Sequence, residues 1–109
     1  MKKDLRISEL NDVYGALLTP RQREILQNYY DYDLSLSEIA ENVGITRQGV
    51  RDTIVKASEQ LSQYEEVIGV LKVKDIAKSR IGETLALLND KDVDGATEVL
   101  RLLLREIQE

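Results

Sequence analysis

The sequence predicts an all-α protein of 109 residues. Apolar residues recur at intervals of three and four through most segments, which is the spacing that one face of an α-helix requires. Strand-like alternation of apolar and polar residues is absent, and a single proline leaves room for long, uninterrupted helices. A chain of this length holds one domain, or a small domain with a helical extension.

The N-terminal third is expected to contain two helices, over residues 8–18 and 20–31, each marked by apolar residues at helical spacing. Thr19 is expected to cap the second helix, and Pro20 then occupies its first position, where a missing N–H costs nothing. Further along, Ser35 and Glu38 form a Ser-x-x-Glu capping box. A third helix is therefore expected to begin directly after Ser35.

Residues 36–54 have the pattern of a helix-turn-helix. Ala40 is small, as required where two helices cross closely, and Gly44 follows where the chain needs a positive φ. Thr46 offers a hydroxyl that caps a second helix. An ordinary helical hairpin is the alternative, but the Ala40–Gly44 spacing and the polar face of the second helix favour the helix-turn-helix. That polar face consists of Arg47, Gln48 and Arg51.

The second motif helix is expected to continue as a long helix through residue 88, weakened or bent at Gly69 and Gly82. It carries a heptad seam, which is typical of helices that pair with one another. The seam runs through Val50, Ile54, Ala57, Leu61, Tyr64, Ile68 and Leu71. These patterns divide the chain into a helix-turn-helix domain over 1–63 and a helical extension over 64–109.

A loop over 89–95 and a final helix from residue 96 complete the expected fold. The final helix has more apolar surface than one neighbouring helix covers, so we expect a homodimer or larger oligomer. The alternative is an intramolecular hairpin in which the last helix folds back and absorbs that surface. The residues expected at the oligomer contact are Leu61, Tyr64, Ile68, Leu71, Leu100, Leu103 and Ile107.

Two smaller patterns each have two interpretations. The segment Asp90–Gly95 matches the first half of an EF-hand loop, but Arg101 stands where the bidentate glutamate belongs. We therefore favour an acidic loop in which Asp92 or Asp94 caps the last helix, and expect no metal. Similarly, four tyrosines before residue 33 could stack on bases, but their spacing favours core packing.

Composition excludes several classes of protein. With no histidine and no cysteine, the chain lacks the commonest general base, nucleophile and transition-metal ligands, so we expect no catalytic residues, no cofactor and no enzyme activity. The lack of cysteine also suits a reducing cytoplasm. No signal peptide and no membrane-spanning apolar run is recognisable. The sequence therefore predicts a soluble, cytoplasmic protein.

The capped helices and the helix-turn-helix pattern together resemble the DNA-contacting C-terminal region of bacterial sigma factors. Residues 17–52 are more specifically similar to the small bacterial YlxM family. In that family Leu-Leu-Thr, a double tyrosine, Ser-Leu-x-Glu-Ile-Ala-Glu and Arg-Gln-x-Val recur in this order, as they do here. The resemblance implies a sigma-like four-helix domain and a regulatory role in the signal recognition particle pathway, in contact with the particle's GTPase or RNA.

Two functional hypotheses follow. The first is a sequence-specific DNA-binding regulator, whose expected contact residues are Thr46, Arg47, Gln48, Arg51, Lys56, Arg21 and Arg23. The second is an accessory protein whose helices bind the signal recognition particle. A net charge of −5, spread over both halves of the chain, weakens non-specific attraction to nucleic acid and favours the second hypothesis.

Overall fold

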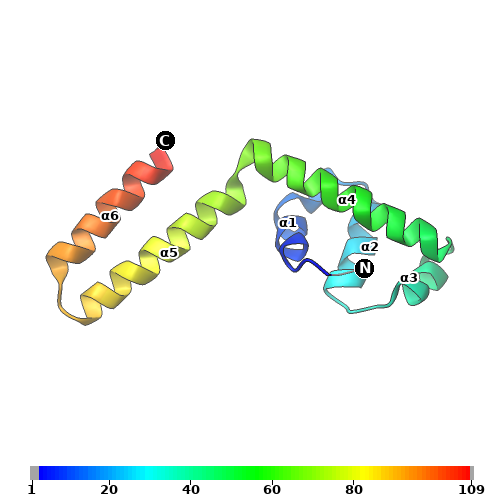
Figure 1. Cartoon of the computed structure of the whole chain (residues 1–109), viewed down its shortest axis with the longest axis horizontal. Coiled ribbons are helices and arrows are strands. Elements are labelled where there is room, and N and C mark those ends of the chain that lie inside the picture. Colours follow the sequence, from blue (N-terminus) through cyan, green and yellow to red (C-terminus); the bar gives the residue numbers. More distant parts are fainter. Residues whose placement is uncertain (1–2, 109) are drawn as a thin grey trace. The chain divides into compact units, whose positions relative to one another are not determined.

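The computed structural model describes residues 3–108, and every regular element in that range is helical (Figure 1). The prediction of an all-α fold is confirmed. None of the helices in the described range has the length and apolarity that a membrane span requires. The elements are α1 (Arg6–Tyr14), a 3₁₀ turn η1 (Gly15–Leu17), α2 (Pro20–Tyr30), α3 (Leu36–Val43), α4 (Arg47–Ile68), α5 (Val70–Asn89) and α6 (Val93–Gln108).

The chain divides into two compact units, unit 1 (Met1–Gly69) and unit 2 (Val70–Glu109). The boundary that we expected between residues 63 and 64 falls inside α4. The helix instead ends at Gly69, which adopts φ +73° and donates its N–H to the carbonyl of Glu65 at 2.9 Å. A left-handed glycine of this kind stops a helix rather than bending it, so the expected passage through Gly69 is corrected. Gly82, by contrast, lies within an unbroken α5.

The caps predicted in unit 1 are present. Thr19 Oγ1 accepts from the backbone N–H of Gln22 at 3.2 Å, and Gln22 Oε1 accepts from the N–H of Thr19 at 3.1 Å. Ser35 and Glu38 make the same reciprocal pair at 3.1 Å in both directions. Each box satisfies two backbone donors that the start of a helix leaves without partners. These local contacts fix where α2 and α3 begin.

Helix α4 is central to unit 1, since α1, α2 and α3 all pack against it. Its inner face is fully buried, at no more than 2% exposure per residue, and each of its larger aliphatic side chains contributes on the order of 1.5–3 kcal/mol. Tyr14 and Tyr29 are also buried, so the core interpretation of these two tyrosines is confirmed, whereas Tyr32 is exposed. The inner face of α4 consists of Val50, Ile54, Ala57 and Leu61.

Those four residues are also the first half of the expected heptad seam. The seam is helical as predicted, but α1, α2 and α3 of the same chain already cover this part of it. Leu61 and Leu71 are 0% and 1% exposed, so neither offers surface to a partner, and their expected place in an oligomer contact is corrected. Of the remaining expected seam residues, Tyr64 is half-buried and Ile68 is exposed.

Unit 2 is a hairpin of α5 and α6. Asp92 caps α6, because its Oδ1 accepts from the N–H of Gly95 at 2.9 Å, as the capping interpretation of this loop predicted. Arg80 joins the two helices through a 2.8 Å ion pair with Glu106 and also contacts Glu83 at 3.2 Å. Hydrogen bonding to Glu106, and then to Glu83, raises the pKa of Arg80. The guanidinium therefore stays charged at all ordinary pH values.

The hairpin buries only part of its apolar surface. Leu103, expected at the oligomer contact, is half-buried. Leu100, Leu104 and Ile107 keep 47%, 52% and 46% of their surface exposed. The intramolecular hairpin that we considered is therefore formed, but within unit 2 it leaves a second apolar face of α6 uncovered.

Candidate nucleic-acid interface

The turn between α3 and α4 has the geometry that the sequence predicted. Gly44 adopts φ +78° and its N–H donates to the carbonyl of Ala40 at 2.9 Å, which closes α3. Thr46 then caps α4 by accepting from the N–H of Gly49 at 2.9 Å. One acceptor site of Thr46 Oγ1 is used in this way. The hydroxyl of this exposed residue can still donate a hydrogen bond, and its expected DNA contact would be made through that donor.

Three polar side chains occupy the first turns of α4, namely Arg47, Gln48 and Arg51, and all three are exposed. The buried residues of α4 described above lie on a neighbouring strip of the helix, so packing against α1–α3 holds α4 and leaves these three side chains exposed. A helix whose first turns project from a small helical domain in this way suits insertion into a major groove.

Gln48 has a partner that sequence reasoning missed. Its Nε2 donates to Asp52 Oδ1 at 2.8 Å. The spacing of four residues on one helix face was the signal that could have revealed the contact. Through this bond Asp52 orients the amide of Gln48, leaving its carbonyl oxygen and one N–H available, and it adds a negative charge beside Arg51.

The other expected basic contacts separate into two places. Arg21, near the start of α2, and Lys56, on α4, line the same hollow of about 310 Å³, together with Asp52. Arg23 lines a different hollow of about 320 Å³ near Gly15, where its Nε lies 3.1 Å from the position that a Cβ on Gly15 would take. The structure thus brings Arg21 and Lys56 together beside α4 and places Arg23 elsewhere.

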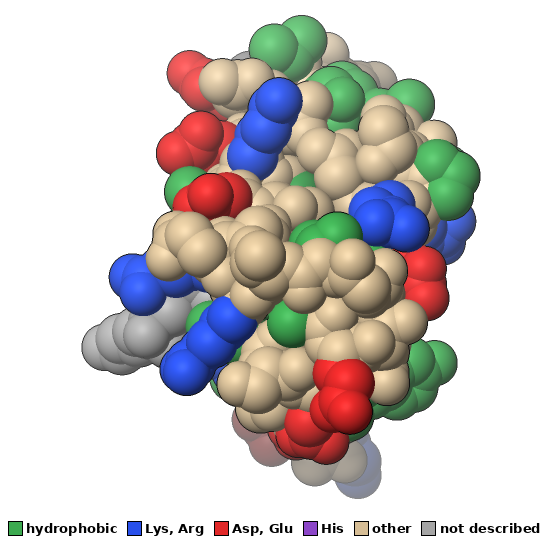
Figure 2. All heavy atoms as spheres, turned by 90° about the vertical axis from the view of Figure 1, so that its right-hand side faces the viewer, with side chains coloured by type: hydrophobic (Ala, Val, Ile, Leu, Met, Phe, Trp, Pro, Cys, Tyr) green, Lys and Arg blue, Asp and Glu red, His purple; other side chains and the backbone are tan. Residues whose placement is uncertain are grey.

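The electrostatics of this surface are mixed. Residues 1–63 carry 8 basic and 10 acidic side chains. Figure 2 views the molecule from the side on which α3 and the start of α4 lie in Figure 1, and it shows separated Lys and Arg patches with Asp and Glu among them. Such a surface provides individual positive contacts rather than a continuous basic track along a phosphate backbone.

The capped α3, the left-handed glycine turn and the exposed start of α4 define a helix-turn-helix protein. The comparisons with known proteins agree. A family model described as "UPF0122: Putative helix-turn-helix protein, YlxM / p13 like" matches residues 1–98, and the chain belongs to this family. The family is a helix-turn-helix family rather than an enzyme family.

Curated relatives of the same family name align over most of the chain. A UPF0122 protein of Desulforamulus reducens is 41% identical over 100 residues, covering 92% of this chain and 86% of its own. A UPF0122 protein of Geobacillus kaustophilus is 38% identical over 109 residues, covering 100% and 97%. A UPF0122 protein of Caldanaerobacter subterraneus is 52% identical over 63 residues, covering 58% of this chain and 54% of its own. The resemblance to YlxM proteins expected from the sequence is thereby confirmed.

Proposed function

We propose that this protein is a helix-turn-helix regulatory protein that takes part in the signal recognition particle pathway and contacts nucleic acid through the start of α4. The exposed set of Arg47, Gln48 and Arg51 on a firmly packed α4 is the observation that supports nucleic-acid contact. The YlxM resemblance supports the pathway. The proposal also implies a cytoplasmic location.

In this proposal the side chains divide by chemistry. Arginine donates two parallel hydrogen bonds to guanine and glutamine pairs with adenine, so Arg47, Gln48 and Arg51 contact base edges. Arg21 and Lys56, which share a hollow beside α4, contact phosphate and set the position of the helix. The 2.8 Å bond from Asp52 restricts how Gln48 can face a base.

The acidic balance of the protein favours a partner beyond nucleic acid. At a net charge of −5, phosphate attraction supplies little non-specific affinity. The particle's GTPase, or the particle's RNA held by that GTPase, is therefore the preferred target. The second candidate is a sequence-specific DNA-binding transcriptional regulator unrelated to the particle, and the base-reading chemistry of α4 is what favours it.

A titration of the purified protein against DNA from upstream of its own operon, and separately against the particle's RNA, tests the nucleic-acid contact. Arg47→Ala should cost about 1–3 kcal/mol of specific binding. The double variant Arg47→Ala/Arg51→Ala should also lower the salt dependence. The matched control, Arg101→Ala/Arg105→Ala, removes the same charge from exposed positions on α6. Equal losses in both double variants would contradict base reading by α4.

Calorimetry with the particle's GTPase and its RNA, separately and together, tests the pathway. We expect micromolar or tighter binding to at least one of them. If neither component gives heat or co-elutes while operon DNA is still bound, the unrelated DNA-binding regulator replaces the pathway proposal.

We further propose that unit 2 forms a homodimer contact. Leu100, Leu104 and Ile107 lie at heptad spacing on the uncovered face of α6, and apolar faces of this kind pair most often around a two-fold axis. Sedimentation equilibrium should give twice the chain mass of 12.4 kDa. Leu100→Glu/Leu104→Glu, at positions that the hairpin leaves half exposed, should return it to the monomer mass. A monomeric parent protein would end this proposal.

A further inference from the structure

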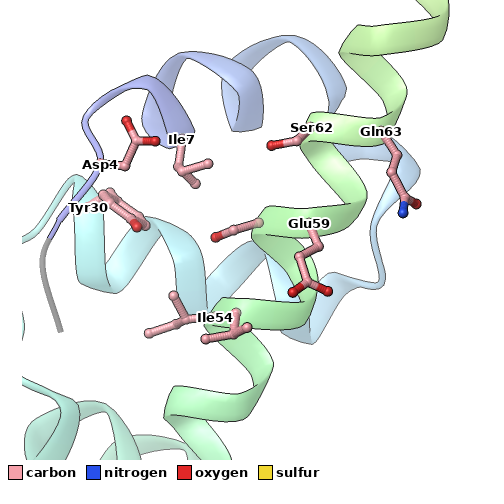
Figure 3. A pocket seen from close by; sticks show the side chains of 9 residues that line it. Asp4, Ile7, Tyr30, Ile54, Glu59, Ser62 and Gln63 are labelled. Atoms are coloured by element: carbon pink, nitrogen blue, oxygen red, sulfur yellow. The ribbon is translucent and has the colours of Figure 1, made fainter.

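Unit 1 has a groove between α1, the end of α2 and the middle of α4, with a volume of about 560 Å³ (Figure 3). Ile7 and Tyr30 stand on one side and Ile54 of α4 on the other, so the floor of the groove is apolar. Ile7 and Ile54 are 6% and 2% exposed, whereas Val55 at the wall keeps 45% of its surface exposed. The groove is large enough to take one or two side chains of a partner.

The edge of the groove is negatively charged. Asp4 and Glu59 both line it and both are exposed. Asp4 accepts a 3.0 Å hydrogen bond from the backbone N–H of Arg6, and within the described residues neither carboxylate is paired with a lysine or arginine side chain. An apolar floor between two unneutralised carboxylates is complementary to an apolar side chain flanked by positive charge.

The wall of the groove also contains an unsatisfied hydroxyl. Ser58 Oγ is buried and, although it lies near the hydroxyl of Tyr30, it makes no hydrogen bond of acceptable geometry in the described part of the chain. A buried hydroxyl without a partner costs free energy, which an occupant with a backbone N–H or C=O at this depth would recover. A peptide brings such groups together with its side chains.

We infer that this groove binds a cationic, apolar peptide segment of a partner protein, with a large aliphatic or aromatic side chain on the apolar floor and Lys or Arg beside Asp4 and Glu59. The inference goes beyond the proposed function. Val55 follows Arg51 by one helical turn, so the groove continues the exposed face of α4 after its basic start. A polyanion at the beginning of α4 and a cationic segment at its middle then use oppositely charged parts of one helix.

The test uses the full chain and a fluorescein-labelled twelve-residue peptide of alternating leucine and lysine as probe, with a leucine–glutamate peptide as its counterpart. We expect saturable binding of the lysine peptide alone. Asp4→Asn/Glu59→Gln, which removes both charges and keeps one side-chain oxygen at each position, should weaken it about five-fold or more. Val55→Asn should weaken it without any change of charge. The matched control is Asp90→Asn/Asp94→Asn, which removes the same charge from exposed positions of unit 2.

Several results would overturn the inference. One is the absence of lysine-peptide binding. Another is equal weakening of that binding in the unit 2 control, since the overall charge of the protein would then explain the effect. Another is amide chemical-shift changes that map to α5 and α6 instead of the groove. If the amide shifts of the groove residues change when the protein is diluted without peptide, the occupant of the groove is a second copy of the chain. If single-stranded RNA instead shifts the amides of the groove residues and binds more tightly to the Asp4→Asn/Glu59→Gln variant, the occupant of the groove is nucleic acid.

Discussion

Replacing Gly44 with alanine tests the turn on which the helix-turn-helix depends. Gly44 adopts φ +78°, and an added Cβ would meet nothing within 4 Å. The change therefore introduces no steric clash, and its whole cost is that of holding an L-residue in the left-handed region, about 1–2 kcal/mol. Unit 1 should lose up to that amount of unfolding free energy, because the restriction that alanine places on the unfolded chain offsets part of the cost.

The same substitution at Gly82 supplies the control, because an added Cβ there also meets nothing within 4 Å, while the backbone is that of an ordinary α-helix. Here alanine restricts the unfolded chain and favours the helix, so unit 2 should gain about 0.5–1 kcal/mol. The same substitution is thus expected to lower stability at Gly44 and raise it at Gly82. Both positions have room for a Cβ, so the difference comes from backbone conformation alone.

Urea denaturation can follow the two units separately. All five tyrosines lie in unit 1, so tyrosine fluorescence reports its unfolding, while far-ultraviolet circular dichroism reports both units. For a domain of this size, a change of 1 kcal/mol also moves the melting temperature by about 4–8 °C. If Gly44→Ala is neutral or stabilising by fluorescence, the left-handed turn is not what closes α3.

Three further changes probe unit 1. Tyr14→Phe should destabilise it by about 1.5–3 kcal/mol in urea, because the Tyr14 hydroxyl donates to Glu65 at 2.6 Å. An unchanged free energy of unfolding would show that this hydrogen bond makes no net contribution to stability. Leu61→Ala should cost about 2–5 kcal/mol without changing the sedimentation mass, whereas a lower mass at full stability would restore Leu61 to an oligomer contact. Burial raises the pKa of Tyr30 above 10.0, so the unfolded state loses this proton first as pH rises past 10. Stability should therefore fall with pH there, and less steeply in Tyr30→Phe; parallel pH profiles would refute the shift.

Local features of the fold were predictable because their causes are local. A capping residue and the donor that it satisfies lie three positions apart, so Thr19, Ser35 and Thr46 could be assigned from spacing. Gly44 was recognisable because it follows a short apolar run and precedes a cap. Gly69 was not, since an isolated glycine inside a helical pattern is compatible with both a weakened helix and a helix end.

Tertiary contacts explain what the sequence did not predict. Helical periodicity shows that Val50 to Leu61 form an apolar face but not which helices cover it, so a seam covered within the chain looked like an oligomer contact. Arg21 and Arg23 are two residues apart and looked equivalent, yet α2 directs them into different hollows. The Gln48–Asp52 bond, in contrast, required only attention to residues four apart.

The most direct test of the central claim is amide chemical-shift mapping of the ¹⁵N-labelled protein during titration with whichever nucleic acid it binds, the operon DNA or the particle's RNA. The claim predicts the largest shifts over residues 46–52, with weaker ones near Arg21 and Lys56, where the hollow beside α4 lies. Shifts confined to α5 and α6, with the start of α4 unchanged at saturation, would contradict it.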